Sequence, residues 1–462
     1  MKKSLIALAA LAATGAFAQS TVTIYGRAHV AVDAMYSAKG GQATVIPAAG
    51  AAAFTSYNVA SRQRIADDGS RIGLRISEDL GGGLRAFSVI ETGINLDTAT
   101  ANGQSGAANS GVGFFGTREA HVGIGNNTGE LRLGRQNVFW GMGPTEDVGA
   151  NRISGGVGSS YTAPSSGYVA APAARMENTI QLVAGSAMGG FAGSSVWYAK
   201  PVTGEAGAPA ATGTSSSAIG CTSTAAQVAI TPVACVPLLT TTTTTNLGNT
   251  AGDQKAVAQG ITLRYITGPF AAQFDYGINK NTNNGVTSIG SAASSTPVFD
   301  TTITGQKLGL AYTYAPGSKV YFANAVFSTK YTEDQFNNVA PWMAVGGPGL
   351  RDTANRGYRK QASNQVGVQH RMGNIELHGQ YVIQGKVKDW QGVSVADTGS
   401  KAYALGARYE LSKRTALTGS YNVIDNEARN NVNIAGGGQS SVAAIGLGAT
   451  LKVARVSVQH QF

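Results

Sequence analysis

Arginines alternate with apolar residues along several short stretches of the chain. Arg71 and Arg75 are interleaved with Ile72, Leu74 and Ile76, and residues two apart in an extended strand share one face. A guanidinium group stays charged at physiological pH and binds carboxylates and phosphates through several donors. The chemistry that this pattern predicts is attraction of anions by fixed positive charges, without bond making.

The sequence has no arrangement of residues suited to covalent or metal chemistry. Its five histidines are scattered without the spacing of a metal site, and no G-x-S-x-G segment offers a serine nucleophile. The sequence therefore predicts no catalytic residue, no cofactor-binding residue, no metal ligand and no enzyme activity. It also predicts no nucleic-acid binding.

The N-terminal segment predicts export. Lys2 and Lys3 precede an apolar run, and the small-residue pattern Ala16-Phe17-Ala18 follows it, which is typical of a secretory signal peptide. We expect residues 1–18 to be cleaved and residues 19–462 to form one domain. Loss of the two lysines lowers the formal charge from +10 to +8. No later segment approaches the roughly 18 consecutive apolar residues of a membrane helix.

The end of the chain indicates how an exported protein without a membrane helix crosses a membrane. Val456, Val458, His460 and Phe462 share one face of a terminal strand. An aromatic residue at the end of a lipid-facing strand fits the interfacial girdle of a membrane barrel. From this strand we expect that the apolar faces of the other strands also contact lipid.

The rest of the chain repeats a cycle of alternating strand, short turn, strand and long polar loop. The first strand places Val22, Ile24 and Val30 on one face and Arg27 and Asp33 on the other. About sixteen such strands follow one another, an even number within the range of bacterial barrels. We therefore predict an all-β fold, a 16-stranded antiparallel transmembrane β-barrel with short turns at one end and long loops at the other.

The longest loop, residues 201–255, contains both cysteines. It is rich in Ala, Ser and Thr and carries Cys221 and Cys235. Exported thiols are usually oxidised, and no C-x-x-C spacing indicates redox catalysis. We expect a disulfide between them that closes part of this loop.

Four motifs carry a family resemblance across the mature chain. They are T-V-T-I-Y-G (21–26), S-R-I-G-L-R-I-S-E-D-L-G (70–81), L-R-L-G-R-Q (131–136) and Y-E-L-S-K-R-T (409–415). In these the chain resembles the general-diffusion porins of beta-proteobacterial outer membranes. The resemblance implies a homotrimer in the bacterial outer membrane, short turns on the periplasmic side, and a third extracellular loop folded into the lumen. It also implies that Phe462 is read by the barrel-assembly machinery.

The resemblance further implies a pore constriction. Carried over to this sequence, the basic wall comprises Arg71, Arg75 and Arg135, and the facing acids of the third loop are Glu146 and Asp147. Alternation alone also places Arg27 on the inner face. It places Arg135 on the outer face, so we expect Arg135 to reach the lumen only because its strand ends at that point.

The function that the resemblance implies is passive diffusion of small hydrophilic solutes and ions. The inward arginines and the mature charge of +8 predict modest anion selectivity. Expected partners are these solutes and anions, outer-membrane lipid and lipopolysaccharide. The alternative is a surface adhesin or receptor barrel that acts through its long loops around a plugged lumen. Ion conductance distinguishes the two.

The last strand contains one irregularity. Leu451 and Val453 take odd positions, whereas the apolar residues from Val456 onward take even ones. A change of face near Ala454 implies either a bulge or a strand that tilts beyond the membrane, and the sequence leaves both open.

Overall fold

The computed structural model describes residues 20–36, 61–97, 100–102, 116–138, 169, 175–200, 257–282, 300–331, 358–389, 391–428, 430, 432 and 448–462. The predicted signal peptide, Glu146, Asp147, Cys221 and Cys235 lie outside these ranges. Within them, no helix is long and apolar enough to span a membrane.

The described chain is almost entirely β-structure. Its only helix in these ranges is the short 3₁₀ helix η2 (Ser186–Phe191). The strands are β1 (Thr21–Tyr36), β2 (Arg62–Asp67), β3 (Arg71–Gly81), β4 (Leu84–Asn95), β5 (Thr100–Asn102), β6 (Glu119–Gly125), β7 (Gly129–Asn137), β8 (Arg175–Ala184), β9 (Ser195–Ala199), β10 (Val257–Thr267), β11 (Phe270–Thr282), β12 (Asp300–Ala315), β13 (Ser318–Tyr331), β14 (Tyr358–Met372), β15 (Ile375–Gln384), β16 (Ser400–Glu410), β17 (Thr415–Asn426) and β18 (Thr450–Gln461).

All 18 elements belong to one antiparallel sheet, which makes sixteen barrel strands. The elements β2 and β3 pair with different parts of β1 and so form one barrel strand. In the same way β5 and β6 pair with different parts of β4. Each barrel strand pairs with the next one along the chain, which confirms the predicted 16-stranded antiparallel barrel.

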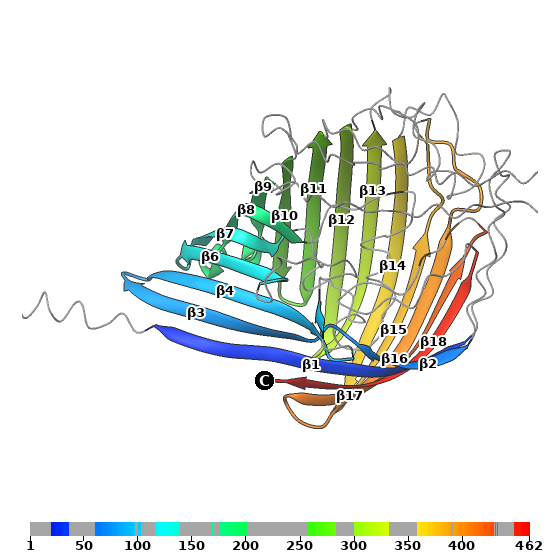
Figure 1. Cartoon of the computed structure of the whole chain (residues 1–462), viewed down its shortest axis with the longest axis horizontal. Coiled ribbons are helices and arrows are strands. Elements are labelled where there is room, and N and C mark those ends of the chain that lie inside the picture. The colour runs from blue at the N-terminus through cyan, green and yellow to red at the C-terminus, as the bar shows by residue number, and fades with distance from the viewer. Residues whose placement is uncertain are drawn as a thin grey trace, which may run out of the picture.

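The sheet closes where its first and last strands meet. β1 pairs with β18 from Arg27 opposite Gln461 to Tyr36 opposite Lys452, and the blue and red strands lie together in Figure 1. The amide of Gly26 donates to the Phe462 carbonyl over 2.9 Å. No edge strand is left at this closure, as a barrel in lipid requires.

The two rims of the barrel differ in the length of their connections. Turns such as Gly82–Gly83 and Pro316–Gly317 join strands at the rim that carries Phe462, here called the turn end. The opposite rim, the loop end, carries connections such as residues 37–61 and 200–256. This arrangement matches the predicted short turns and long loops.

The two faces of the sheet differ in polarity. Exposed apolar residues such as Ile24, Val366 and Val458 point outward. The alternate positions, including Arg27, Gln365 and Gln459, face inward and are buried. The outer face is therefore suited to lipid and the inner face to a polar lumen.

A bulge interrupts the second barrel strand. Between the β2 and β3 pairings, Asp68, Gly69 and Ser70 stand opposite only Ala28 and His29 of β1. An extra residue exchanges the two faces of a strand. Outward residues accordingly change from odd-numbered Ile65 to even-numbered positions in β3.

The last strand has no corresponding bulge. Its register with β1 and β17 is continuous from Thr450 to Gln461, so the bulge is excluded as one of the two explanations left open for the change of pattern near Ala454. Leu451 and Val453 face inward, as Arg455 does, and belong to a buried apolar cluster at the loop end. The apolar residues of this strand change from odd to even positions because the inner face at the loop end is itself apolar.

A second apolar cluster includes a residue of the connection between β7 and β8, which is the third connection at the loop end. Val169, the one described residue between Val138 and Arg175, is 2% exposed and packs in a cluster with Trp197 and Phe327. Both aromatic residues face inward on their strands. Val169 therefore lies inside the barrel, consistent with the expected inward course of the third loop.

Candidate pore-lining site

Arginines at five of six consecutive barrel strands, all but β4, form a row on the inner face, here called the arginine arc. The register places Arg27 opposite Arg71, Glu91 opposite Glu119 and Arg135 opposite Ala120, so these positions follow one another around the wall. The members of the arc are Arg27, Arg71, Arg118, Arg135 and Arg175.

Glu91 is the acid at the centre of the arc. Its carboxylate accepts a hydrogen bond from Arg118 Nε over 2.6 Å and one from the Tyr25 hydroxyl over 3.1 Å. Arg71 Nε lies 3.6 Å from the same carboxylate. These contacts hold two guanidinium groups in place and neutralise part of their charge.

Arg75 lies one layer nearer the turn end. Its guanidinium carbon is 4.2 Å from the centre of the Tyr25 ring, a cation–π distance. The Tyr25 ring in turn covers Gly73, where an added Cβ would lie 2.5 Å from the ring. A side chain at residue 73 would therefore displace the ring on which Arg75 rests.

Arg27 is placed differently from the other predicted arginines. Only 4% of the residue is exposed, and its guanidinium donates to the carbonyls of Asp68 and Gly69 over 3.0 and 2.8 Å. Its charge lies within the wall, where it holds the bulge between β2 and β3.

Arg135 is turned by a second bulge. The register between β7 and β8 shifts between Gly134 and Gln136, and Gly134 has a φ of 128°, which side chains rarely adopt. Arg135 donates to the Thr117 carbonyl over 3.1 Å and lies 3.6 Å from Glu177. The bulge therefore overrides the strict alternation that turns Arg135 outward.

A smaller charged group lies at the turn end of the same strands. Glu130 binds both Arg85 and Arg132, with Arg132 Nε at 2.9 Å. Both guanidinium groups lie over the inward-facing ring of Phe87. This group extends the basic wall below the arc.

The wall formed by β14 and β15 carries a row of amides, which lies between Arg359 and Arg371 on the inner face of β14. Gln361, Gln365 and Gln369 follow one another on the inner face of β14, and Gln380 and Gln384 lie on β15. Both polar atoms of the Gln365 amide are buried without a hydrogen-bond partner. We call this surface the glutamine wall.

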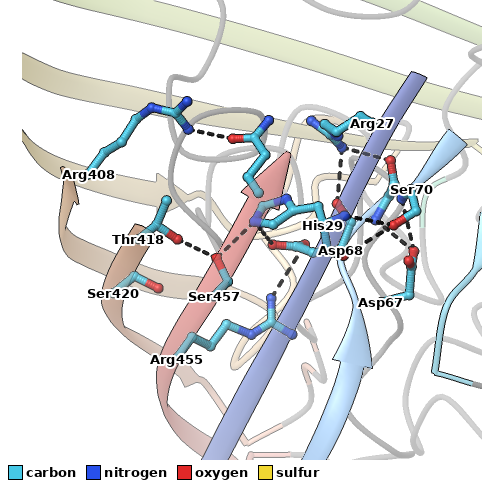
Figure 2. A network of polar contacts seen from close by, with 12 residues as sticks. Arg27, His29, Asp67, Asp68, Ser70, Arg408, Thr418, Ser420, Arg455 and Ser457 are labelled. Carbon is cyan, nitrogen blue, oxygen red and sulfur yellow. Dashed lines mark hydrogen bonds and ion pairs between the residues drawn. The ribbon is translucent and has the colours of Figure 1, made fainter. Parts of the chain in front are cut away.

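A buried network fastens the closure of the barrel (Figure 2). Arg455 Nε lies 2.6 Å from Asp33 Oδ1, and its NH1 lies 3.8 Å from Asp68. His29 Nε2 is 2.8 Å from Ser457 Oγ, and the His29 amide donates to Ser70 Oγ over 2.9 Å.

This network does not have the arrangement of a catalytic triad. Asp68 approaches the same His29 nitrogen as Ser457 does, at 3.6 Å, whereas the Nδ1 atom has no hydrogen-bond partner. A triad needs the carboxylate on the opposite ring nitrogen. In addition, no cluster of three or more potential metal ligands occurs among the residues that the structure describes.

The structure adds four site residues that sequence reasoning missed, which are Glu91, Arg118, Glu119 and Arg175. Arg118 and Arg175 lie at or just before the loop-end start of their strands, where alternation cannot assign a face. Strands β8 and β9 were themselves missed. The alternation of Ile180 with Leu182 and of Val196 with Tyr198 could have indicated them.

A closed sixteen-stranded barrel with an apolar outer face and a charged inner face is an outer-membrane channel fold. Residues 4–429 match the family model described as Gram-negative porin. The chain belongs to this family, which confirms the predicted resemblance and places the protein in the outer membrane of a Gram-negative bacterium.

Individual relatives agree with this assignment. The chain is 40% identical over 144 residues to outer membrane porin protein 32 of Delftia acidovorans, a match that covers 30% of this chain and 32% of that relative. The match thus spans about a third of the curated relative.

Solved structures share the fold at low identity. An anion-selective porin from Comamonas acidovorans matches with a TM-score of 0.56 at 20% identity, covering 96% of this chain and all of that one. The trimer form of OmpT from Vibrio cholerae matches with a TM-score of 0.52 at 12% identity, covering 96% and 99% of the two chains.

Proposed function

We propose that the protein is a passive diffusion channel for small hydrophilic solutes and ions, with a modest preference for anions. The observation that carries the proposal is the arginine arc on the inner face of a closed barrel. Apart from Arg27, which lies within the wall, the four arginines of this row stand beside three glutamates, Glu91, Glu119 and Glu177, so the arc carries a small surplus of positive charge.

The size of the expected preference follows from electrostatics in a wet channel. Two unit charges 4 Å apart interact by about 1 kcal/mol in water and about 4 kcal/mol at an effective dielectric of 20. Since about 1.4 kcal/mol is a factor of ten, a partly neutralised arc favours anions several-fold. Salt weakens this preference, because the screening length is about 8 Å at physiological ionic strength.

Related proteins support the same proposal. The Comamonas acidovorans structure is called an anion-selective porin, and the Delftia acidovorans relative is called an outer membrane porin. We extend these properties to this chain as part of the proposal. Glu146 and Asp147 remain proposed as the acids that face the arginines across the constriction.

The further proposed properties come from the family. We propose a homotrimer in contact with outer-membrane lipid and lipopolysaccharide, and the description of the Vibrio cholerae structure as a trimer form supports it. We also propose that residues 1–18 are cleaved, that Phe462 is read by the assembly machinery, that Cys221 and Cys235 form a disulfide, and that the protein has no enzyme activity.

Single-channel recording in a planar bilayer tests the channel and its selectivity. We expect stepwise ohmic conductance and a reversal potential under a salt gradient that reports anion preference. Arg71→Ala with Arg75→Ala should shift this potential toward cations, because both charges leave the lumen. The matched control is Lys413→Ala with Arg414→Ala, which removes equal charge from the exposed turn before β17.

The outcomes separate the two candidate functions. A barrel that inserts without conductance would support a plugged adhesin or receptor in place of a channel. Cation preference in the unmodified protein, or equal shifts from the lumen and turn variants, would refute selectivity by the arginines.

A further inference from the structure

The five inward amides of the glutamine wall form one zigzag row along the barrel. Gln384 is opposite Ser363 of β14, and Gln380 is opposite Gly367, so each of these β15 amides lies diagonally between two amides of β14. Long side chains reach such diagonal neighbours across a sheet. From the loop end to the turn end, the order of the row is Gln361, Gln384, Gln365, Gln380 and Gln369.

The amides at the two ends of this row are fixed to the backbone of neighbouring connections. The Gln361 side chain donates to the carbonyls of Gly385 and Thr398 over 3.0 and 3.2 Å. The Gln369 side chain donates to the Gly317 carbonyl over 2.9 Å. Both glutamines therefore hold the wall together.

The amides in the middle of the row are not fixed in this way. Both polar atoms of Gln365 and the Nε2 atom of Gln384 are buried without a hydrogen-bond partner among the described residues, and each residue is 2% exposed. Only Gln384 Oε1 has a partner, because it accepts from Asn430 over 2.9 Å. Directly opposite Gln365 lie Ala323 and Val382, whose side chains have no polar atom. Two amino groups and one carbonyl oxygen are therefore left unused.

Folding alone does not account for the amide at residue 365. A buried donor or acceptor without a partner lowers stability, and native proteins contain few such groups. An apolar side chain between Ala323 and Val382 would avoid this cost. Departures from such local rules are expected at functional sites, so the middle of the row is a candidate binding site.

The three unused groups define the chemistry of a ligand. Gln365 presents a donor and an acceptor side by side on one planar group. A second amide matches this edge, because its N–H donates to Gln365 Oε1 while its oxygen accepts from Gln365 Nε2. The same oxygen has another lone pair, which can accept from Gln384 Nε2. A ketone or a carboxylate lacks the N–H donor and leaves Gln365 Oε1 unpaired.

We propose that Gln365 and Gln384 bind small uncharged solutes that carry a primary amide or a urea group, and we call this pair the amide site. The proposal rests on the proposed channel function, because such solutes reach the inner face through the lumen. A neutral solute carries no net charge for the arginine arc to attract, so its retention depends on hydrogen bonds. The amide site therefore gives the lumen a second, uncharged class of ligand.

Binding of three pyridines of similar shape to the purified, folded protein tests the proposal. Nicotinamide carries a primary amide, 3-acetylpyridine has a methyl ketone in its place, and nicotinate has a carboxylate. Dissociation constants are measured by saturation-transfer NMR in detergent micelles. The test variant is Gln365→Leu. The matched control is Gln306→Leu, which makes the same change at an exposed position of β12 on the outer face, and heat-dependent electrophoretic mobility checks that both variants fold.

The loss of one hydrogen bond weakens binding about fivefold and the loss of two about thirtyfold. We therefore expect Gln365→Leu to bind nicotinamide about five to thirty times more weakly than the unmodified protein does, and Gln306→Leu to bind it normally. The unmodified protein should bind 3-acetylpyridine about fivefold more weakly than nicotinamide. Equal affinity of Gln365→Leu and the unmodified protein for nicotinamide would overturn the proposal. Equal affinity of the unmodified protein for the amide and the ketone would also overturn it, and this comparison needs no variant.

Nicotinate separates the amide site from the proposed channel function. Its charge should be attracted by the arginine arc, so Arg71→Ala with Arg75→Ala should weaken nicotinate binding and leave nicotinamide binding unchanged. Equal losses of both ligands in this variant would overturn a separate amide site. A barrel without ion conductance would refute the channel, while the comparison of nicotinamide with 3-acetylpyridine would still decide the amide site.

Discussion

The two halves of the same sheet are built differently. The sector from β1 to β8 carries the arginine arc inside and has no lysine among its described residues, whereas the sector from β9 to β18 adds the glutamine wall to inward arginines such as Arg371 and carries outward lysines such as Lys280 and Lys330. We call them the arginine sector and the glutamine sector.

The difference shows how one barrel divides its tasks around the circumference. Arginines face inward in both sectors, but only the first sector gathers them in one row along the lumen, where they can act on solutes. The second sector adds lysines on its outer face. Arginine occupies the positions with several fixed acceptors, such as the Asp68 and Gly69 carbonyls around Arg27. Lysine occupies the exposed rim, where a flexible point charge suffices.

The two sectors meet at the closure between β1 and β18. Breaking the buried ion pairs of this closure should cause the largest loss of barrel stability. The Arg455 side chain is fully buried against Asp33 and Asp68. Removal of one partner from a buried pair typically costs about 3–5 kcal/mol. Arg455→Ala should therefore lower the thermal unfolding midpoint of the folded barrel, measured by its heat-dependent electrophoretic mobility.

Arg414→Ala serves as the control for this prediction, because Arg414 lies exposed in the turn before β17. Adding Asp68→Asn to Arg455→Ala should restore part of the lost stability, because the buried Asp68 carboxylate loses the nearby Arg455 guanidinium, whereas Asp33 keeps Arg64 at 3.1 Å. An Arg455→Ala barrel as heat-resistant as the unmodified protein would mean that the network does not hold the two sectors together.

The turn end of the same closure depends on the terminal aromatic residue. The Phe462 ring lies 2.3 Å from the point where a Cβ on residue 26 would lie, so the ring covers Gly26. Deletion of Phe462 removes both this cover and the backbone hydrogen bonds with Gly26. We expect a reduced yield of assembled barrel with unchanged conductance in the molecules that do assemble.

Gly26→Val tests whether the contact or the recognition of Phe462 governs assembly. The valine displaces the ring but leaves the terminal residue in place, so a normal yield with Gly26→Val and a low yield without Phe462 would favour recognition by the assembly machinery. Gly81→Val is unsuitable as a control because of its positive φ, whereas Gly419→Val lies on the outer face, where an added Cβ would meet only the Arg455 carbonyl oxygen at 3.9 Å. Normal assembly without Phe462 would contradict the prediction.

Alternation in the sequence was sufficient to predict the features that depend on local geometry. It placed Val456, Val458 and Phe462 on the outer face, where the structure has them exposed. These features follow from the two-residue period of a strand, which does not depend on distant contacts.

The features that alternation could not predict arise where distant segments change the register. The bulge at Asp68–Ser70 depends on hydrogen bonds to His29, about forty residues away in the chain, and the bulge at Gly134 turns Arg135 inward. The inward Leu451 and Val453 imitated a bulge because apolar residues at the loop end pack inside the barrel. The pattern of polar and apolar residues in the sequence could not distinguish a bulge from an inner face that is itself apolar.

The smallest expected change in stability is at the glutamine wall, and it tests how this wall differs from the arginine arc. Gln365 is 2% exposed, and its amide has no hydrogen-bond partner. A buried polar group without a partner typically costs about 1–3 kcal/mol, and an apolar replacement of similar shape removes that cost. Gln365→Leu should therefore raise the stability of the barrel by about 1 kcal/mol, measured by chemical unfolding in detergent.

The same variant should leave the reversal potential unchanged, because it removes no charge. Gln369→Leu is the matched comparison, since the Gln369 amide donates to the Gly317 carbonyl over 2.9 Å and its loss should destabilise the barrel. If Gln365→Leu shifted ion selectivity as strongly as Arg71→Ala with Arg75→Ala, neutral amides would share in selecting ions, and the contrast between the two sectors would not hold.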